Sequence, residues 1–166
     1  MCFEEQSTLK LLTELVEELE HRKQLLSASG LSNIDHHNAA TGDNLQRYIF
    51  ACDELAEMLD KTGLTKDQKE TVNKIEGLLS TIARQGRAFG IHLILATQRP
   101  DSTILNGQIK NNINCRICGR ADNVLSMIIL DKTDAADQIL EDTQGRFLLH
   151  DGTMFQAYWF DDTGGV

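Results

Sequence analysis

Two apolar stretches, RYIFACDE at residues 47–54 and IHLILATQRP at residues 91–100, decide how this chain folds. Each is a run of apolar residues that ends in charged or polar ones. A short apolar run predicts a buried strand, and a continuous one is typical of parallel sheets with helices on both faces. The sequence therefore predicts a buried strand at 47–52 and a strand at 91–97 that is covered on both faces.

Helical patterns alternate with these strands along the chain. Leucines recur every three or four residues after Ser7 and Thr8, which predicts an amphipathic helix that stops at Gly30. Thr65 and Gln68 have the spacing of a capping box, which predicts the start of a second long helix. Helices are expected at 8–28, 55–61, 66–88, 122–130 and 134–141, with a polar connector at 32–46 and a loop holding a short helical piece at 98–112.

The C-terminal part adds a third strand at 113–118 and a hairpin. The hairpin is expected to turn at Asp151-Gly152, a pair that favours a type I′ turn, and residues 161–166 are expected to be loose. Alternating strands and helices predict an α/β fold with a mainly parallel sheet and an antiparallel hairpin at the C-terminal end. The length of 166 residues suits one domain.

The composition is that of an ordinary globular protein in a reducing compartment. Apolar residues make up 41% of the chain, and no apolar run approaches the ~20 residues that span a membrane. The acidic start is unlike a secretory signal peptide, and four cysteines are too few for a disulfide scaffold, so a cytoplasmic location is expected. Cys115 and Cys118 lie three apart on an expected strand and should point to opposite faces, which argues against a shared metal ion.

Charge is distributed unevenly along the chain. The net charge of −9 argues against a nucleic-acid binder, but residues 84–120 contain six basic residues and one acid. Such a stretch is compatible with a local phosphate-binding face. It is also compatible with a set of arginines exposed to solvent on helices and loops.

Two adjacent acids, Asp53 and Glu54, follow the first expected strand. In open α/β sheets, ligands bind beyond the carboxyl ends of the strands. Two acids there suit nucleotide hydrolysis, since one can hold Mg²⁺ and the other can polarise the attacking water. An apolar run followed by Asp-Glu is a Walker B pattern. The alternative is that the acids only cap the next helix, whose N-terminus favours negative charge.

Polar residues also follow the second strand and the long helix. Thr97 and Gln98 are expected at the same sheet edge as Asp53 and Glu54, where Gln98 could sense a γ-phosphate or orient water; ordinary loop chemistry is the alternative. Arg87 lies at the end of the long helix, where the helix dipole favours a cation. The functional alternative is that Arg87 reaches a phosphate bound to a neighbouring subunit.

Side by side, these positions resemble the FtsK/SpoIIIE family of hexameric DNA-translocating ATPases, over nearly the whole chain from about residue 9 to residue 160. The strongest segment is 77–122, in which GRA, GIH, ATQRP, IK and NI follow one another in the family's order. DELAE at residues 53–57 resembles the family's Walker B motif, and Glu17, Glu20 and Arg22 resemble the segment before it.

The resemblance implies a RecA-like P-loop NTPase core that binds ATP and Mg²⁺. Asp53 would be the acid that holds Mg²⁺ through water, and Glu54 would be the catalytic base. Thr97 would belong to the nucleotide site, and Gln98 would be the phosphate sensor. Arg87 would be the arginine finger that each subunit presents to the next one in a hexameric ring.

The resemblance also implies double-stranded DNA as the partner. Lys110, together with Arg116 and Arg120, would lie on or near loops that face DNA in the channel of the ring. Contacts from such residues to phosphates suit tracking of the backbone without reading its sequence. Whether the parent protein is tethered to the inner face of the cell membrane is left open.

The chain departs from the family in one important respect. It contains no G-x-x-x-x-G-K-[ST] motif, the Walker A loop that cradles the phosphates. Residues 1–166 are therefore expected to be one partial ATPase domain, from Walker B to the C-terminal hairpin, that does not hydrolyse ATP alone. Because the Walker A strand is central in such sheets, the gap is expected to be closed, filled by another copy or left open. Near the end, Gln144-Gly145-Arg146 departs from the family's pattern, so no role is transferred there.

Three functions compete at this point. The first is a fragment of an ATP-driven motor that pumps double-stranded DNA in chromosome segregation or conjugation, with conjugation slightly favoured because no domain that reads DNA sequence is seen. The second is a non-catalytic module that binds or regulates a motor. The third is a protein-secretion ATPase of the same superfamily.

Overall fold

The computed structural model describes residues 2–98 and 107–159, with side chains from residue 5 onward. The chain forms two compact units. The first unit is built from residues 1–98 and 104–112, and the second from residues 99–103 and 113–166. The expectation of one partial domain over 1–166 stays a prediction.

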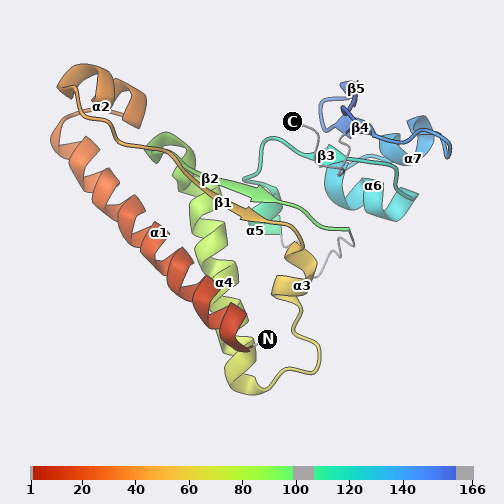
Figure 1. The fold of residues 1–166 in the computed structure, drawn as a ribbon, viewed down its shortest axis with the longest axis horizontal. Helices are drawn as coiled ribbons and strands as arrows, with labels where there is room; N and C mark the ends of the chain where they lie inside the picture. Colours follow the sequence, from red (N-terminus) through yellow and green to blue (C-terminus); the bar gives the residue numbers. More distant parts are fainter. Residues whose placement is uncertain (1, 99–106, 160–166) are drawn as a thin grey trace. The chain divides into compact units, whose positions relative to one another are not determined.

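The first unit has a parallel pair of strands beside two long helices (Figure 1). Strands β1 and β2 pair in register, with Phe50 opposite Leu93. In chain order the elements are α1 (Cys2–Ala28), α2 (Ile34–Thr41), β1 (Tyr48–Cys52), α3 (Leu55–Leu59), α4 (Lys66–Gln85), the 3₁₀ turn η1 (Gly86–Phe89), β2 (Ile91–Leu95) and α5 (Gly107–Lys110).

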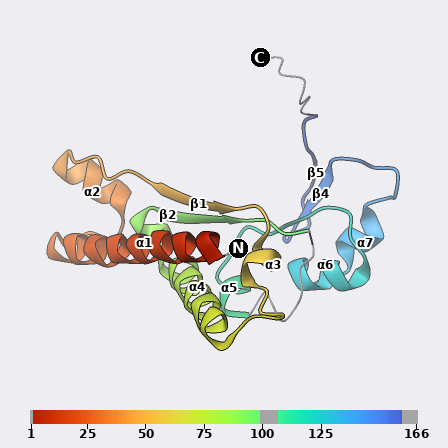
Figure 2. The same ribbon diagram turned by 60° about the horizontal axis from the view of Figure 1, so that its bottom comes forward.

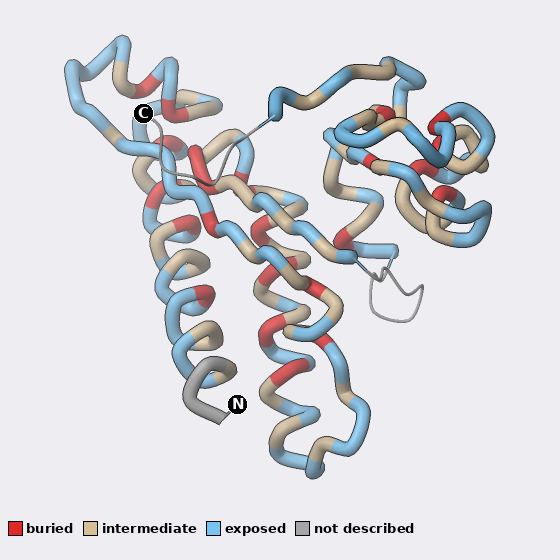
Figure 3. Tube along the Cα trace, turned by 45° about the vertical axis from the view of Figure 1, so that its right-hand side comes forward, coloured by how far each residue is buried: buried red, intermediate tan, exposed pale blue. Residues whose placement is uncertain are grey.

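The core of the first unit lies where α1 packs on α4. The buried residues of each helix recur at helical spacing, so each helix presents one apolar stripe (Figure 3). Burying one such side chain stabilises the fold by about 1.5–3 kcal/mol. The stripes consist of Leu12, Leu19 and Leu26 on α1 and of Val72, Ile75, Leu79 and Ile82 on α4.

One face of the parallel pair is open, which corrects the expectation that the strand at 91–97 is covered on both faces. Phe50 and Ile91 are buried on the face that α1 and α4 cover (Figure 2). Alternate residues point the other way, and there Ile49 is 64% exposed and Ile94 is 57% exposed. Within the described residues β1 and β2 pair only with each other. The apolar run correctly predicted a strand, but it wrongly predicted that both faces of the strand would be covered.

Helices α3 and α4 of the first unit end at Leu59 and Gln85, slightly before the expected residues 61 and 88. Two larger differences from the sequence expectation lie nearer the N-terminus. Helix α1 begins at Cys2 rather than at residue 8, and the polar connector contains the helix α2. Asn33 caps α2 by accepting a hydrogen bond from the His36 N–H, and Gly42 ends it with a φ of +79°. The capping box of Thr65 with Gln68 is confirmed at the start of α4.

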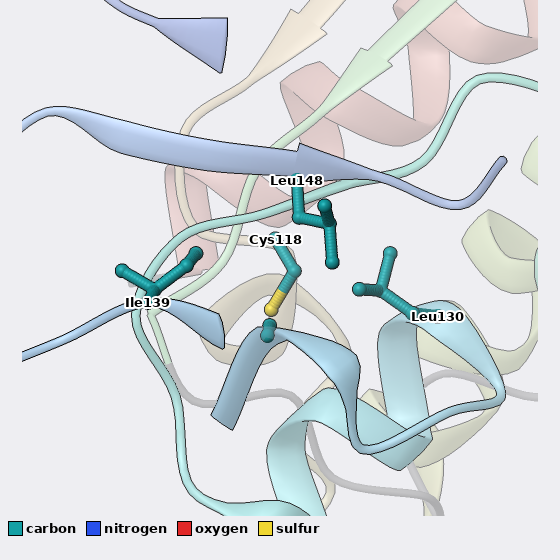
Figure 4. Close-up of a cluster of buried hydrophobic side chains, with 5 residues drawn as sticks. Cys118, Leu130, Ile139 and Leu148 are labelled. Atoms are coloured by element: carbon teal, nitrogen blue, oxygen red, sulfur yellow. The ribbon is translucent and has the colours of Figure 1, made fainter. Parts of the chain in front are cut away.

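The second unit is a small antiparallel sheet with two short helices packed on it. Cys118, Leu130, Ile139 and Leu148 form its buried cluster together with Ala135 (Figure 4). The strands pair in the order β3-β4-β5. The elements are β3 (Ile117–Cys118), α6 (Asn123–Leu130), α7 (Asp134–Gln138), β4 (Arg146–Leu149) and β5 (Met154–Gln156).

Two details of the C-terminal prediction are corrected. The third strand is shorter than 113–118 and antiparallel to β4, so a mainly parallel sheet is wrong for the described strands. The hairpin forms, but its turn is not type I′, since Asp151 lacks the positive φ that this turn needs. Gly152 alone is left-handed, with a φ of +92°, as in three-residue hairpin loops. The loose tail at 161–166 falls outside the described residues.

Candidate functional site

The carboxyl ends of β1 and β2 bring Glu54 together with the residues that follow β2. Glu54 Oε1 accepts a hydrogen bond from Thr97 Oγ1 at 2.5 Å, and Glu54 Oε2 accepts one from the Gln98 N–H at 3.0 Å. A further bond of 3.3 Å comes from the Ala56 N–H to Glu54 Oε1. The expectation that these residues share one sheet edge is confirmed.

The backbone sets this arrangement. Beyond the strands proper, the Ala96 N–H donates to the Cys52 carbonyl at 2.8 Å and the Leu55 N–H donates to the Ala96 carbonyl at 2.8 Å. These bonds carry the parallel register past the last paired residues, so the chain leaves β1 and β2 side by side. Glu54 therefore faces Thr97, which follows from strand pairing alone.

Glu54 has a structural task as well as a candidate chemical one. It is the N-cap of α3, whose first turn it closes through the Ala56 N–H. The alternative considered from the sequence, an acid that caps the next helix, thus describes Glu54 correctly. The same carboxylate is also tied to the end of β2, which a helix cap does not require, and this second tie fixes its direction at the sheet edge.

Asp53 differs from Glu54 in its surroundings. It is exposed and makes no hydrogen bond or ion pair with the residues that the structure describes. A carboxylate in this state can bind a cation. The described part of the chain holds no cluster of three or more metal-binding side chains.

Cys52 lies just before this pair of acids but is a poor candidate for chemistry. Burial raises the pKa of its thiol above the ordinary value of 9.0, and the charges of Asp53 and Glu54 raise it further, against a backbone hydrogen bond that lowers it. The thiol therefore stays protonated at neutral pH. A protonated thiol is neither a good nucleophile nor a good metal ligand.

Gln98 and Arg87 lie at opposite ends of β2. Gln98 is exposed beyond the carboxyl end, whereas Arg87 lies on η1, before the amino end (Figure 1). The strand rises about 3.3 Å per residue, so Arg87 and Thr97 are separated by most of the length of the strand. The Arg87 side chain is exposed and makes no hydrogen bond or ion pair within the described residues. In its own chain it is remote from Glu54.

The three basic residues expected near DNA belong to two different units of the chain. Lys110 ends the short helix α5 of the first unit, which packs on α4. Arg116 and Arg120 belong to the second unit, and both are paired with acids. Arg116 Nη1 lies 2.9 Å from Asp131 Oδ2 with its side chain 18% exposed. Arg120 is half exposed and bonds to Glu141. No pattern in the sequence pointed to either acid.

Sequence reasoning also missed the burial of Arg22. Arg22 on α1 is 2% exposed and bonds to Glu18 and to two backbone carbonyls. On a helix rich in glutamates, an arginine is normally expected to be exposed to solvent. Its position in step with Leu19 and Leu26, on the apolar stripe, was the signal that could have found it.

Comparison with known proteins identifies close relatives. The family model described as the FtsK/SpoIIIE family matches residues 4–102. The chain is 36% identical, over 81% of its length, to the DNA translocase FtsK of Chlorobaculum tepidum, of which it covers 16%. It is 37% identical, over 62% of its length, to the DNA translocase SftA of Bacillus subtilis, of which it covers 10%.

Solved structures agree with this grouping. The structure of the pCW3 conjugation coupling protein TcpA, determined as a monomer with ATPγS, matches with a TM-score of 0.88 and 44% identity. The match covers 95% of this chain and 46% of that one. The cytoplasmic domain of the type VII secretion ATPase EccC of Thermomonospora curvata matches with a TM-score of 0.69 and 21% identity, which shows a shared fold. Among the described helices, none combines the length and the apolar character needed to cross a membrane.

Proposed function

Because the chain belongs to the FtsK/SpoIIIE family, we propose that it is the part of a P-loop motor ATPase that supplies the catalytic carboxylates of ATP hydrolysis. The observation that carries this proposal is the bonding of Glu54 to Thr97 and to the Gln98 backbone at the carboxyl ends of two parallel strands. Ligands of open α/β sheets bind at such an edge.

Each acid at this edge has a distinct role in the proposal. Asp53 holds Mg²⁺, directly or through water, and the bound ion would neutralise charge on the phosphates. Glu54 accepts a proton from the attacking water, and its ties to β2 keep the carboxylate pointed at the sheet edge. Thr97 orients Glu54, and Gln98 offers an exposed amide beyond β2 that senses the γ-phosphate. The chain is one part of a RecA-like core.

A neighbouring subunit completes the site. Arg87 lies at the other end of β2 from Glu54, so it cannot act on the nucleotide of its own chain. In a ring, it reaches the phosphate held by the next subunit, as an arginine finger does. The phosphate-binding loop is not in this sequence, so the residues named here act together with a Walker A loop supplied by the rest of the motor.

The motor is proposed to move double-stranded DNA in a hexameric ring. Relatives at 36–37% identity are named DNA translocases, and the structural neighbour at 44% identity is named a conjugation coupling protein. Conjugative transfer is therefore favoured over chromosome segregation. Lys110, Arg116 and Arg120 are the candidate DNA contacts, and Arg116 and Arg120 would have to release Asp131 and Glu141 to make them. A cytoplasmic location follows from this role, with or without a membrane tether.

Titration calorimetry with Mg-ATP tests the proposal. This chain alone and a version that also carries a Walker A loop are compared, and only the second is expected to bind. In the second, Asp53→Asn should weaken binding in Mg²⁺ but not in EDTA, with the exposed Glu57→Gln as the matched control. Tight binding by the short chain would overturn the proposal.

DNA-stimulated hydrolysis separates the competing functions. A translocase fragment restored with its Walker A loop hydrolyses ATP faster when double-stranded DNA is added. A protein-secretion ATPase would be indifferent to DNA. A non-catalytic module would fail to hydrolyse ATP even with the loop restored.

A further inference from the structure

Arg22 is a charged side chain with an unusual set of partners. It lies on α1 and is 2% exposed. Its Nε donates to Glu18 Oε1 at 2.6 Å, and its Nη1 donates to the carbonyls of Phe89 at 2.7 Å and of Gln46 at 2.8 Å. The guanidinium also lies 4.9 Å from the centroid of the Tyr48 ring. One side chain thereby joins three segments of the first unit.

The two carbonyls mark the amino ends of the parallel strands. Gln46 comes just before β1, and Phe89 is the last residue of η1, the turn that carries Arg87. Between Phe89 and β2, Gly90 has a φ of +72°, and its carbonyl accepts a hydrogen bond from the Tyr48 N–H at 2.8 Å. Arg22 therefore holds the turn at the point where it joins the sheet.

A second residue of α1 holds the other end of the same turn. Lys23 Nζ donates to the side-chain oxygen of Gln85 at 2.9 Å, and Gln85 is the last residue of α4. Consecutive residues of one helix thus bond to the residue before η1 and to its last residue. The segment between them, which includes Arg87, is tied to α1 at both ends, through the side chain of Gln85 and through the backbone carbonyl of Phe89.

The turn has little room to relax. A Cβ on Gly86 would come within 2.3 Å of the Ile91 carbonyl oxygen. One on Gly90 would come within 2.3 Å of Ile34 and within 3.3 Å of Arg22 Nη1. The start of η1 is therefore packed against backbone, and the glycine that follows it is packed against the side chains of Ile34 on α2 and Arg22 on α1. Arg87 itself is exposed and makes no bond with the described residues, so its direction depends on this backbone.

The choice of arginine also points to a positioning role. Removing a charge from water is costly, and apolar residues of similar volume usually pack as well or better. An arginine offers five donors in a rigid fork, which lets one residue serve acceptors from separate segments at once. Leu19 and Leu26 fill positions on the same buried stripe of α1 with apolar side chains. The specific gain at position 22 is the fixed geometry of the two carbonyls.

From these contacts, we propose that Arg22 is a positioning residue that sets the direction of Arg87 toward the neighbouring subunit. The proposal rests on the role of Arg87 proposed above. Arg22 touches neither nucleotide nor the reacting atoms, and it acts through the Phe89 carbonyl on the turn. It is distinct from the Glu54 site, which lies at the opposite end of β2.

Mixed assemblies test this role in the assembled protein that also carries a Walker A loop. A subunit with Glu54→Gln keeps its finger and loses its own site, whereas a subunit with Arg87→Ala keeps its site and loses its finger. In a mixture, the intact site of an Arg87→Ala subunit can lie beside the intact finger of a Glu54→Gln subunit, and hydrolysis should be restored there. Arg22→Met should behave as Arg87→Ala does. Its mixture with Glu54→Gln should hydrolyse ATP several-fold faster than the mean of pure Arg22→Met and pure Glu54→Gln.

The controls separate the two proposals. Arg22→Met mixed with Arg87→Ala should show no recovery, since both lack a directed finger, and the exposed Lys10→Gln on α1 should match the parent. Recovery with Arg87→Ala but not with Arg22→Met would overturn the positioning role and leave the finger intact. No recovery with Arg87→Ala would overturn the proposed finger, and the positioning role with it.

A second variant covers the case in which Arg22→Met fails to fold. Arg22→Lys keeps the charge but loses the fork, so its single, shorter-reaching nitrogen has to serve Glu18 and both carbonyls, which Arg22 serves from two nitrogens. We expect its kcat to fall by roughly tenfold to 100-fold, the scale of a misplacement of about 1 Å, with the dissociation constant for Mg-ATP unchanged. A matching loss of nucleotide binding would show a general structural defect and would overturn the proposal.

Discussion

The two ends of the β1–β2 pair support their candidate residues in different ways. At the carboxyl end, Glu54 is held by Thr97 and Gln98, which follow the paired strand. At the amino end, Arg87 makes no bond with the described residues, and the turn beneath it is held by Arg22, which is 67 residues away from Phe89 in the chain. A group that serves its own site is fixed directly, and a group that must reach out is fixed through its backbone.

The largest expected effect belongs to the carboxyl end. Glu54→Gln should lower the hydrolysis rate of the motor carrying a Walker A loop by about 10²–10⁴-fold, the usual range for loss of a general base. Glutamine can still accept bonds from Thr97 and Gln98, so the fold and the binding of Mg-ATP should persist. Steady-state hydrolysis and calorimetry measure the two quantities. A Glu54→Gln variant with full activity would remove Glu54 from the chemistry.

Arg22→Met at the amino end should have the largest effect on stability. It leaves the carbonyls of Gln46 and Phe89 without their donor and Glu18 without its cation. We expect a loss of about 2–4 kcal/mol in the free energy of unfolding, since breaking one side of a buried charged network is costly. Urea denaturation followed by circular dichroism measures it. A change below that of the exposed control Lys10→Gln would show that Arg22 holds nothing.

Thr97→Val sharpens the comparison at the carboxyl end. The hydroxyl supplies one of the bonds to Glu54 and is only half-buried, so its loss should cost about 1 kcal/mol of unfolding free energy. The effect on stability should therefore be smaller than that of Arg22→Met, while the effect on the rate of hydrolysis should exceed the effect on binding of Mg-ATP. Equal losses of rate and affinity would place Thr97 on the nucleotide rather than behind Glu54.

The same contrast explains which parts of the structure were predictable. The meeting of Glu54 with Thr97 follows from two apolar runs that each end in polar residues, because parallel strands bring their carboxyl ends together. The anchoring of η1 was not predictable, because the acceptors of Arg22 are backbone carbonyls that carry no sequence signature. The ion pair of Arg116 with Asp131 was not predictable either, because it depends on how the second unit folds.

Other misses had signals in the sequence. Asn33 and Gly42 cap the two ends of α2, and Ile34 is its buried apolar residue, but the many polar residues between them suggested a loop. The open face of β1 and β2 had no signal, because Ile49 and Ile94 are as apolar as residues that helices cover. What covers a strand depends on the rest of the sheet.

The smallest expected effect is chemical and concerns Cys52, which ends β1 beside the two acids. Burial raises its pKa above 9.0, so at pH 8 it should react with iodoacetamide more slowly than the exposed Cys115, when both are followed by mass spectrometry in a Cys2→Ser background. Since the folded pKa is the higher one, the protonated thiol contributes stability that is present below pH 9 and is lost as the pH rises through the folded value. Cys52→Ala should therefore flatten the fall in stability above pH 9. Labelling of Cys52 as fast as Cys115 would mean that the carboxyl end of β1 opens readily, and the direct support of Glu54 would then be weaker than the support of η1.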